Sequence, residues 1–166
     1  MKIIELKIRR FKELVTGILL GNGTEWSLIR VNVVDYVLDG FQFTNKKYIA
    51  YEREINESTM RHRILSIKNR TEYLSPIEKD TVLNDNELLF SFLKRKEILV
   101  AICLHREDVI YVGRIKDVKL NSFVFDSYDP ELRESGVMKI DYSKVRYVQV
   151  HTDYLDSLSL LLGHEN

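Results

Sequence analysis

The chain has 166 residues, of which 45% are hydrophobic, and its 25 basic side chains balance 25 acidic ones. This composition is typical of a folded globular protein and excludes disorder as the main state. The net charge of zero argues against nucleic-acid binding through bulk positive charge. No apolar run approaches the roughly 20 residues that cross a bilayer, so we expect a cytoplasmic protein that does not bind a membrane.

The first half begins with residues 4–15, which we interpret as a weakly amphipathic helix. Stretches rich in Val, Ile, Tyr and Phe then predict five strands. They cover residues 14–20, 26–38, 41–43, 48–51 and 64–69. Gly-Asn-Gly at residues 21–23 predicts a hairpin turn between the first two strands.

The second half has the same order. Asn84 as N-cap, with Glu87 three residues later, predicts a helix whose apolar face carries Leu88, Leu89, Phe92 and Leu93. Five more strands are predicted at residues 98–104, 109–118, 123–125, 137–142 and 145–150. Thr152 is placed to cap a last helix. Its apolar face would carry Tyr154, Leu155, Leu158, Leu161 and Leu162.

Three pairs of matching blocks indicate an internal duplication of about 80 residues. Residues 64–74 align with 145–155 (145 − 64 = 81), residues 33–43 with 115–125 (115 − 33 = 82), and residues 11–21 with 95–105 (95 − 11 = 84). We place the first repeat at 1–75, a linker at 76–86 and the second repeat at 87–166. The expected fold is mainly β with short helices: two tandem five-stranded antiparallel barrels, each preceded by a helix.

These blocks resemble the Sm-like family of small SH3-like barrels. That family carries a glycine in strand two, then an aspartate and, four residues later, an asparagine. The second half offers Gly113, Asp117 and Asn121, followed by "SFVF". The first half offers Asp35 and Asp39, followed by "GFQF", and has no glycine at the first position.

The second motif of the family joins strands four and five. The bacterial host-factor branch (Hfq) has Tyr-Lys-His-Ala-Ile-Ser there, and residues 60–66 read "MRHRILS", with Arg61 and His62 at the lysine and histidine positions. The second half reads "DYSKVRY" and lacks this basic pair. The resemblance implies that strand four of one barrel pairs with strand five of the next in RNA-binding rings. It also implies that two copies in one chain can form an internal pseudo-dimer.

A nucleic-acid site is predicted in the first half, where two guanidinium groups and a histidine supply donors for phosphate and a ring for base stacking. The alternative is a solvated basic turn that Glu52, Glu54 and Glu57 neutralise. A second basic and aromatic group lies nearby in the sequence. The predicted site residues are Arg61, His62, Arg63, Lys46, Lys47, Tyr48 and Phe41.

Signatures of metal binding and catalysis are missing from the sequence. The four histidines have no close ligand spacing, and Cys103 is a single cysteine in an apolar run, where we expect a buried hydrophobe. The acidic stretch 126–136 does not match a calcium loop. We therefore expect no metal, no cofactor, no small-molecule substrate and no enzyme activity.

Two functions remain. The first is a non-enzymatic, bacterial-type interaction or assembly module that binds a protein partner or itself. Residues 1–81 carry a charge of +3 (14 − 11) and residues 82–166 a charge of −3 (11 − 14), and unlike ends favour head-to-tail association. The alternative is a single-stranded RNA-binding protein that uses the first repeat. We rank assembly first, because likeness of fold is a weak basis for RNA binding.

Overall fold

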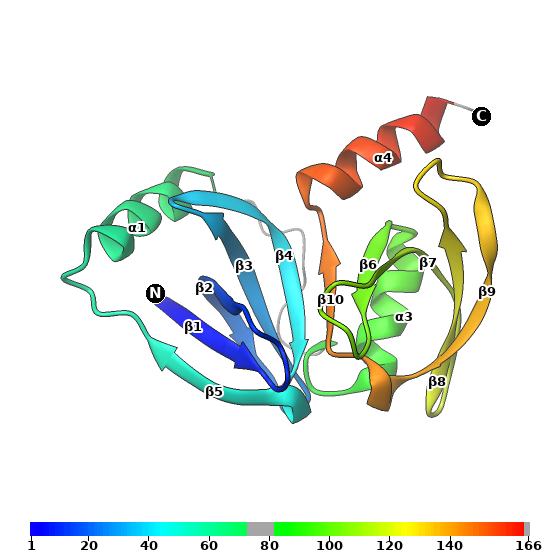
Figure 1. Ribbon diagram of the computed structural model, residues 1–166, viewed down its shortest axis with the longest axis horizontal. Helices are drawn as coiled ribbons and strands as arrows, with labels where there is room; N and C mark the ends of the chain where they lie inside the picture. Colours follow the sequence, from blue (N-terminus) through cyan, green and yellow to red (C-terminus); the bar gives the residue numbers. More distant parts are fainter. Residues whose placement is uncertain (73–81, 165–166) are drawn as a thin grey trace.

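The structure is a computed structural model that describes residues 1–72 and 82–164. Its ten strands form one antiparallel sheet in the order β5-β1-β2-β3-β4-β10-β6-β7-β8-β9 (Figure 1). The first half contributes β1 (Lys2–Ile8), β2 (Leu14–Asn22), β3 (Trp26–Val34), β4 (Val37–Asn45) and β5 (Ile49–Glu54). The second half contributes β6 (Val100–Cys103), β7 (Ile110–Lys119), β8 (Ser122–Tyr128), β9 (Glu134–Asp141) and β10 (Tyr147–Val150).

The sheet is single and open, so the prediction of two closed five-stranded barrels, each preceded by a helix, is wrong. The reason is the pairing of β4 with β10, in which residues 41–44 lie opposite residues 147–150. The backbone groups on that side of β4 bond to the second half, so β4 does not pair with β5 and close the first five strands. We call this β4–β10 pairing the central joint.

The predicted first helix, residues 4–15, is also wrong, because β1 and the start of β2 occupy that stretch. Ile4, Leu6 and Ile8 are all buried, and their spacing of two residues is the period of a strand. Residues 26–38, predicted as one strand, are two. Asp35 has a φ of +44° at the turn between β3 and β4.

The predicted strand 64–69 is wrong in turn, because helix α1 (Met60–Glu72) covers it. Thr59 accepts bonds from the backbone of the first turn, at 3.2 Å from the His62 N–H to its hydroxyl and at 3.1 Å from the Arg63 N–H to its carbonyl. His62 and Leu65 are buried three residues apart, which is helical spacing. The "RHRILS" motif therefore lies on a helix and not between strands four and five.

Helix α3 (Asn86–Lys96) covers the second half, as predicted, although Asp85 rather than Asn84 is its cap, accepting from the Leu88 N–H at 3.1 Å. Phe90 stacks on Phe123 with ring centroids 4.2 Å apart. The Trp26 indole N–H donates to the Asn86 side chain at 3.1 Å. One buried cluster thus joins β3 and β4 of the first half to α3 and the second half. The expected linker, 76–86, lies largely outside the described residues.

The predicted last helix is confirmed as α4 (Asp153–His164), with Thr152 as its cap, accepting from the Leu155 N–H at 3.2 Å. None of the helices in residues 1–72 and 82–164 is long and apolar enough to cross a membrane.

Both halves have the same strand register, at a constant offset of 96 residues. This offset relates β1–β5 to β6–β10 in chain order. The predicted offsets of 81 to 84 are therefore wrong for the strands, since they align the β3–β4 hairpin with β7–β8. In the pairing of β1 with β2, Ile4↔Gly17 corresponds to Val100↔Gly113 in β6 and β7 (100 − 4 = 96). In the pairing of β1 with β5, Lys7↔Tyr51 corresponds to Cys103↔Tyr147 in β6 and β10 (103 − 7 = 96). In the pairing of β3 with β4, Leu28↔Phe43 corresponds to Val124↔Lys139 in β8 and β9 (124 − 28 = 96). A common origin of the halves stays a prediction.

Candidate functional site

The sequence-predicted cluster at residues 61–63 lies in the first turn of α1. Arg61 and Arg63 are exposed, whereas His62 is buried against the body of the protein. Its Nε2 atom has no hydrogen-bond partner among the described residues. His62 therefore cannot stack on a base in this conformation, and only the two arginines face solvent.

The second predicted group, Lys46, Lys47 and Tyr48, forms the short 3-10 helix η1 (Lys46–Tyr48) between β4 and β5. The Lys46 ammonium donates to the Gly23 carbonyl at 2.8 Å, and the Tyr48 hydroxyl donates to the Ser143 carbonyl. The Arg146 guanidinium lies 3.4 Å from the centroid of the Tyr48 ring. Tyr48 therefore bridges the two halves.

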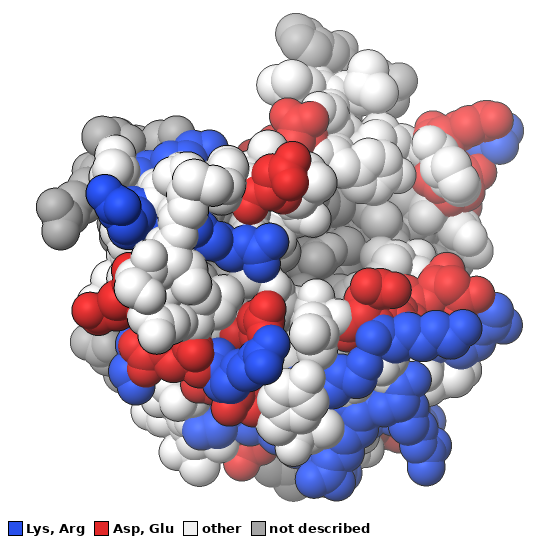
Figure 2. Space-filling model, turned by 60° about the vertical axis from the view of Figure 1, so that its left-hand side comes forward, with Lys and Arg blue, Asp and Glu red and all other residues white. Residues whose placement is uncertain are grey.

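Phe41, the last predicted residue, lies on β4 within the shared core. The structure does not bring the predicted residues together, since β5 separates η1 from α1 and Phe41 is buried. On the face that Figure 2 shows, basic side chains gather at the lower right with acidic ones directly above them, and the two kinds are mixed elsewhere.

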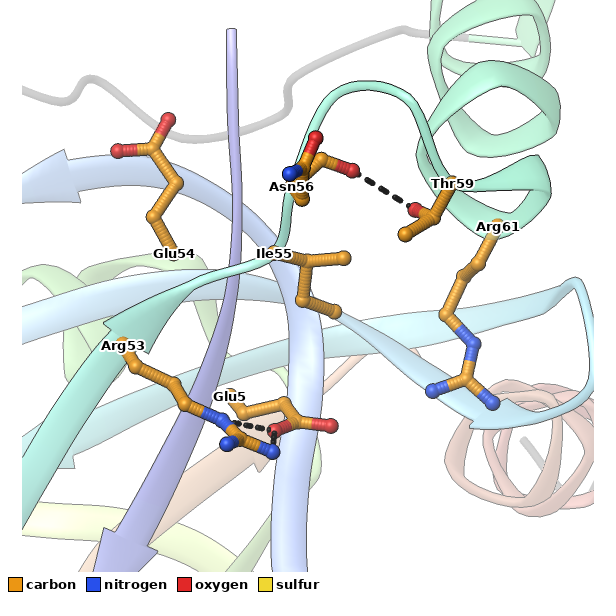
Figure 3. Close-up of a pocket in the computed structure, with 7 residues that line it drawn as sticks. All are labelled: Glu5, Arg53, Glu54, Ile55, Asn56, Thr59 and Arg61. Carbon is orange, nitrogen blue, oxygen red and sulfur yellow. Dashed lines mark hydrogen bonds and ion pairs between the residues drawn. The ribbon is translucent and has the colours of Figure 1, made fainter.

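Arg61 does line a pocket of about 380 Å³ at the β5 end of the sheet (Figure 3). Glu5 of β1 and Arg53 of β5 form an ion pair on its floor, with a closest N–O distance of 2.5 Å. Arg61 extends from α1 toward the same space. The pocket is lined by Glu5, Arg53, Glu54, Ile55, Asn56, Thr59 and Arg61.

This pocket opens beside β5, which is the first edge of the sheet. Among the described strands, β5 is hydrogen-bonded to β1 alone. Five of its six residues are exposed, including Tyr51 and Glu52. Unpaired backbone N–H and C=O groups along such a strand are a template for another strand.

The second edge is β9, which has only β8 as a neighbour in the described sheet. Val137 is 63% exposed and Lys139 is exposed, whereas Ile140 is buried. Gly136 has a φ of +137°, and a Cβ atom added there would meet nothing within 4 Å. The two ends of the sheet are therefore both open to a further strand.

The central joint shows how such an edge pairs in this protein. The Gln149 side chain donates to that of Gln42 at 3.1 Å, on one face of the paired strands. Asp39, just before the joint on β4, accepts from the Asp153 N–H at 2.7 Å and so caps α4. A Cβ atom on Gly40 would lie 2.8 Å from the Thr152 backbone nitrogen. Glycine at residue 40 lets β4 approach the start of α4.

Two titratable groups lie at the joint, the buried Cys103 and the partly buried Tyr147. Cys103 is fully buried, as predicted, and burial raises the pKa of its thiol to about 11. Burial also raises the pKa of the Tyr147 hydroxyl, and Tyr147 lies opposite Cys103 in the ladder. Both groups stay neutral at physiological pH, so the thiol is not activated as a nucleophile.

No family model matches the chain, and no curated protein or solved structure is significantly similar to it. Within residues 1–72 and 82–164, no three His, Cys, Asp or Glu side chains come together as a metal site.

Sequence reasoning missed the two sheet edges. The available signal was the pair Gly40 and Gly136, together with Gly17 and Gly113, both at an offset of 96. At Gly17 and Gly113 an added Cβ would lie within 2.3 Å of a carbonyl oxygen on the next strand. These glycines mark equivalent close approaches in the two halves.

Proposed function

We propose that the protein is a non-enzymatic assembly module that associates with protein chains by extending its sheet at β5 and β9. The observation that carries the proposal is the open sheet, in which neither end strand has a second neighbour among the described residues, while two interior strands, β4 and β10, already join the halves edge to edge. The paired backbone of this joint is the same structural unit that β-augmentation uses.

The side chains on the two edge strands favour pairing with a selected partner strand over unspecific aggregation. Natural edge strands are protected from random pairing by charged residues, and β5 carries Glu52, Arg53 and Glu54. A partner strand must offset these charges, so the edge discriminates among strands. Apolar contact area is available as well, because Tyr51 is 47% exposed and Val137 63%.

Single-stranded RNA is the weaker candidate. Its predicted stacking groups, Phe41 and His62, are buried, and Tyr48 is covered by Arg146. The exposed arginines of α1 offer phosphate contacts without a base platform. We propose the cytoplasm as the compartment, an expectation that rests on the sequence alone.

Size-exclusion chromatography with light scattering tests the proposal. We expect a mass above the 19.6 kDa of one chain that grows with protein concentration, because edge pairing obeys mass action. A strict monomer at high concentration, in both low and high salt, would contradict assembly through the chain's own edges.

A further inference from the structure

The proposed function leaves the partner open, and the internal repeat identifies one. We propose that the strand that pairs with β5 is β9 of a second copy of this chain, in the register of the central joint. This inference rests on the proposed function. It adds the identity of the partner, the order of the strands and the residue-by-residue register.

The register follows from the offset of 96 residues. At the central joint, residues 41–44 of β4 lie antiparallel to residues 147–150 of β10. Adding 96 to the first set gives residues 137–140 of β9, and subtracting 96 from the second gives residues 51–54 of β5. The expected pairs between copies are Ile140↔Tyr51, Lys139↔Glu52, Met138↔Arg53 and Val137↔Glu54.

One of these four pairs brings opposite charges together. Lys139 lies opposite Glu52 in this register, at the position where the central joint has the pair Phe43↔Val148. Both charged residues are exposed, and neither has an ion-pair partner in the described part of the chain. Opposite charges directly across an antiparallel pair are stabilising. A second copy would therefore pair the two groups.

Gly136 gives an independent indication. Its counterpart at the joint is Gly40 (136 − 40 = 96), where a Cβ atom would lie within 3 Å of three atoms of Thr152. Nothing lies within 4 Å of the same point at Gly136. The residue equivalent to Thr152 is Asn56 (152 − 96 = 56), at the pocket beside β5. A copy docked on β5 would bring Gly136 close to Asn56.

The hydrogen bond from β4 to the start of α4 also has equivalent positions in this register. Asp39 accepts from the Asp153 N–H within the chain, and their counterparts are Ser135 of β9 and the backbone of Glu57, which precedes α1. Ser135 is exposed, and its hydroxyl can accept a bond from that N–H. Met138 would then lie beside Arg53 over the pocket in Figure 3, as Gln42 lies beside Gln149.

Each chain carries one β9 edge and one β5 edge, so the contact is heterologous. A dimer formed this way still has one free edge of each kind and can add further copies. Such an assembly closes into a ring if the rotation between copies closes, and otherwise extends as a filament.

Disulfide formation between two single-cysteine variants tests the register. Glu52→Cys and Lys139→Cys, each in a Cys103→Ala background, are mixed under mild oxidation and analysed as covalent dimers. Cross-strand neighbours are within reach of a disulfide, so we expect dimers in the mixture and none with either variant alone. Arg53→Cys mixed with Lys139→Cys is the control, because adjacent residues point to opposite faces of the strand.

Charge exchange tests the contact without cysteine. Glu52→Lys or Lys139→Glu alone should weaken association roughly tenfold, and the double variant should restore it.

Three outcomes of these experiments are distinguishable. A matched disulfide together with charge rescue supports the inference. A light-scattering mass above the monomer, with dimers of Glu52→Cys alone or with no matched disulfide, would overturn the second-copy register while edge assembly stands. A monomer without any covalent dimer would overturn the second copy as the partner and, with it, the self-association that the light-scattering test of the proposed function expects.

Discussion

The central joint and the two outer edges share a backbone register but carry different side chains. At the joint, Phe43 and Val148 are fully buried opposite each other, and the contact holds the two halves together within one chain. At the same positions of the edges, Lys139 and Glu52 are exposed. Burying an apolar pair stabilises the folded chain strongly. An exposed pair of opposite charges contributes little free energy on its own. The difference fits the proposal that the joint is a folding contact and that the edges form a reversible assembly contact.

The largest expected effect comes from truncating equivalent residues of the two regions. Phe43→Ala should lower the free energy of unfolding by about 3–5 kcal/mol, because it removes a fully buried aromatic side chain. Lys139→Ala should change it by less than about 0.5 kcal/mol, because its side chain is exposed. Chemical denaturation measures both. Equal losses in the two variants would break the distinction between joint and edge.

A second comparison uses the two glycines. Gly40→Ala should cost about 3 kcal/mol, since a left-handed φ of +62° and a Cβ atom within 3 Å of Thr152 act together. Gly136→Ala adds backbone strain at a φ of +137° but no steric conflict within the chain, so it should cost less. Thermal unfolding of the monomer at low concentration checks the order. A larger loss at residue 136 would show that the approach of Gly40 to Thr152 is not what distinguishes the joint from the edge.

Removing the acceptor at residue 39 or at the equivalent residue 135 should give a smaller difference in the free energy of unfolding. Asp39→Ala removes the acceptor of the Asp153 N–H and should destabilise the protein by about 1 kcal/mol. Ser135→Ala, at the equivalent position of β9, should leave the monomer unchanged and weaken only its association. Denaturation of both variants, with sedimentation velocity for the second, measures these effects. Loss of monomer stability in Ser135→Ala would argue that β9 is not a free edge.

The smallest expected effect is a change in the pH dependence of stability that involves the thiol beside the joint. The pKa of Cys103 is raised from 9.0 to about 11 in the folded protein, chiefly by burial. The unfolded chain therefore releases this proton first, so the stabilising contribution is complete below pH 9 and is lost between pH 9 and 11. Cys103→Ala should flatten the fall in unfolding free energy between pH 9 and 10. An unchanged slope would show that the thiol is solvated in the folded state.

The sequence predicted nine of the ten strands at least in part, because β-branched and aromatic runs identify strands wherever they occur. It failed at the beginning, where Ile4, Leu6 and Ile8 follow a period of two that the neighbouring Ile3 obscures. It failed again at α1, where Ile64 and Ile67 suggest a strand although Thr59 starts a helix. Local patterns could not resolve either stretch without the strand pairings.

The candidate site could not be predicted for a different reason. An edge is a property of the strand order, and that order depends on long-range pairing such as β4 with β10. The predicted site residues have suitable chemistry and lie close together in the sequence. In the structure, however, His62 and Phe41 are buried and contribute to packing. Closure of each half was a plausible way to remove free edges, yet the chain satisfies β4 with a strand of its other half.

Hydrogen–deuterium exchange at low and high protein concentration tests the central claim most directly, because it reads the backbone bonds of the joint and the edges separately. We predict that amides of β4 and β10 are protected at both concentrations, and that amides of β5 and β9 gain protection together as concentration rises. Protection of one edge alone, or of neither while the mass increases, would contradict the equivalence of the joint and the edges.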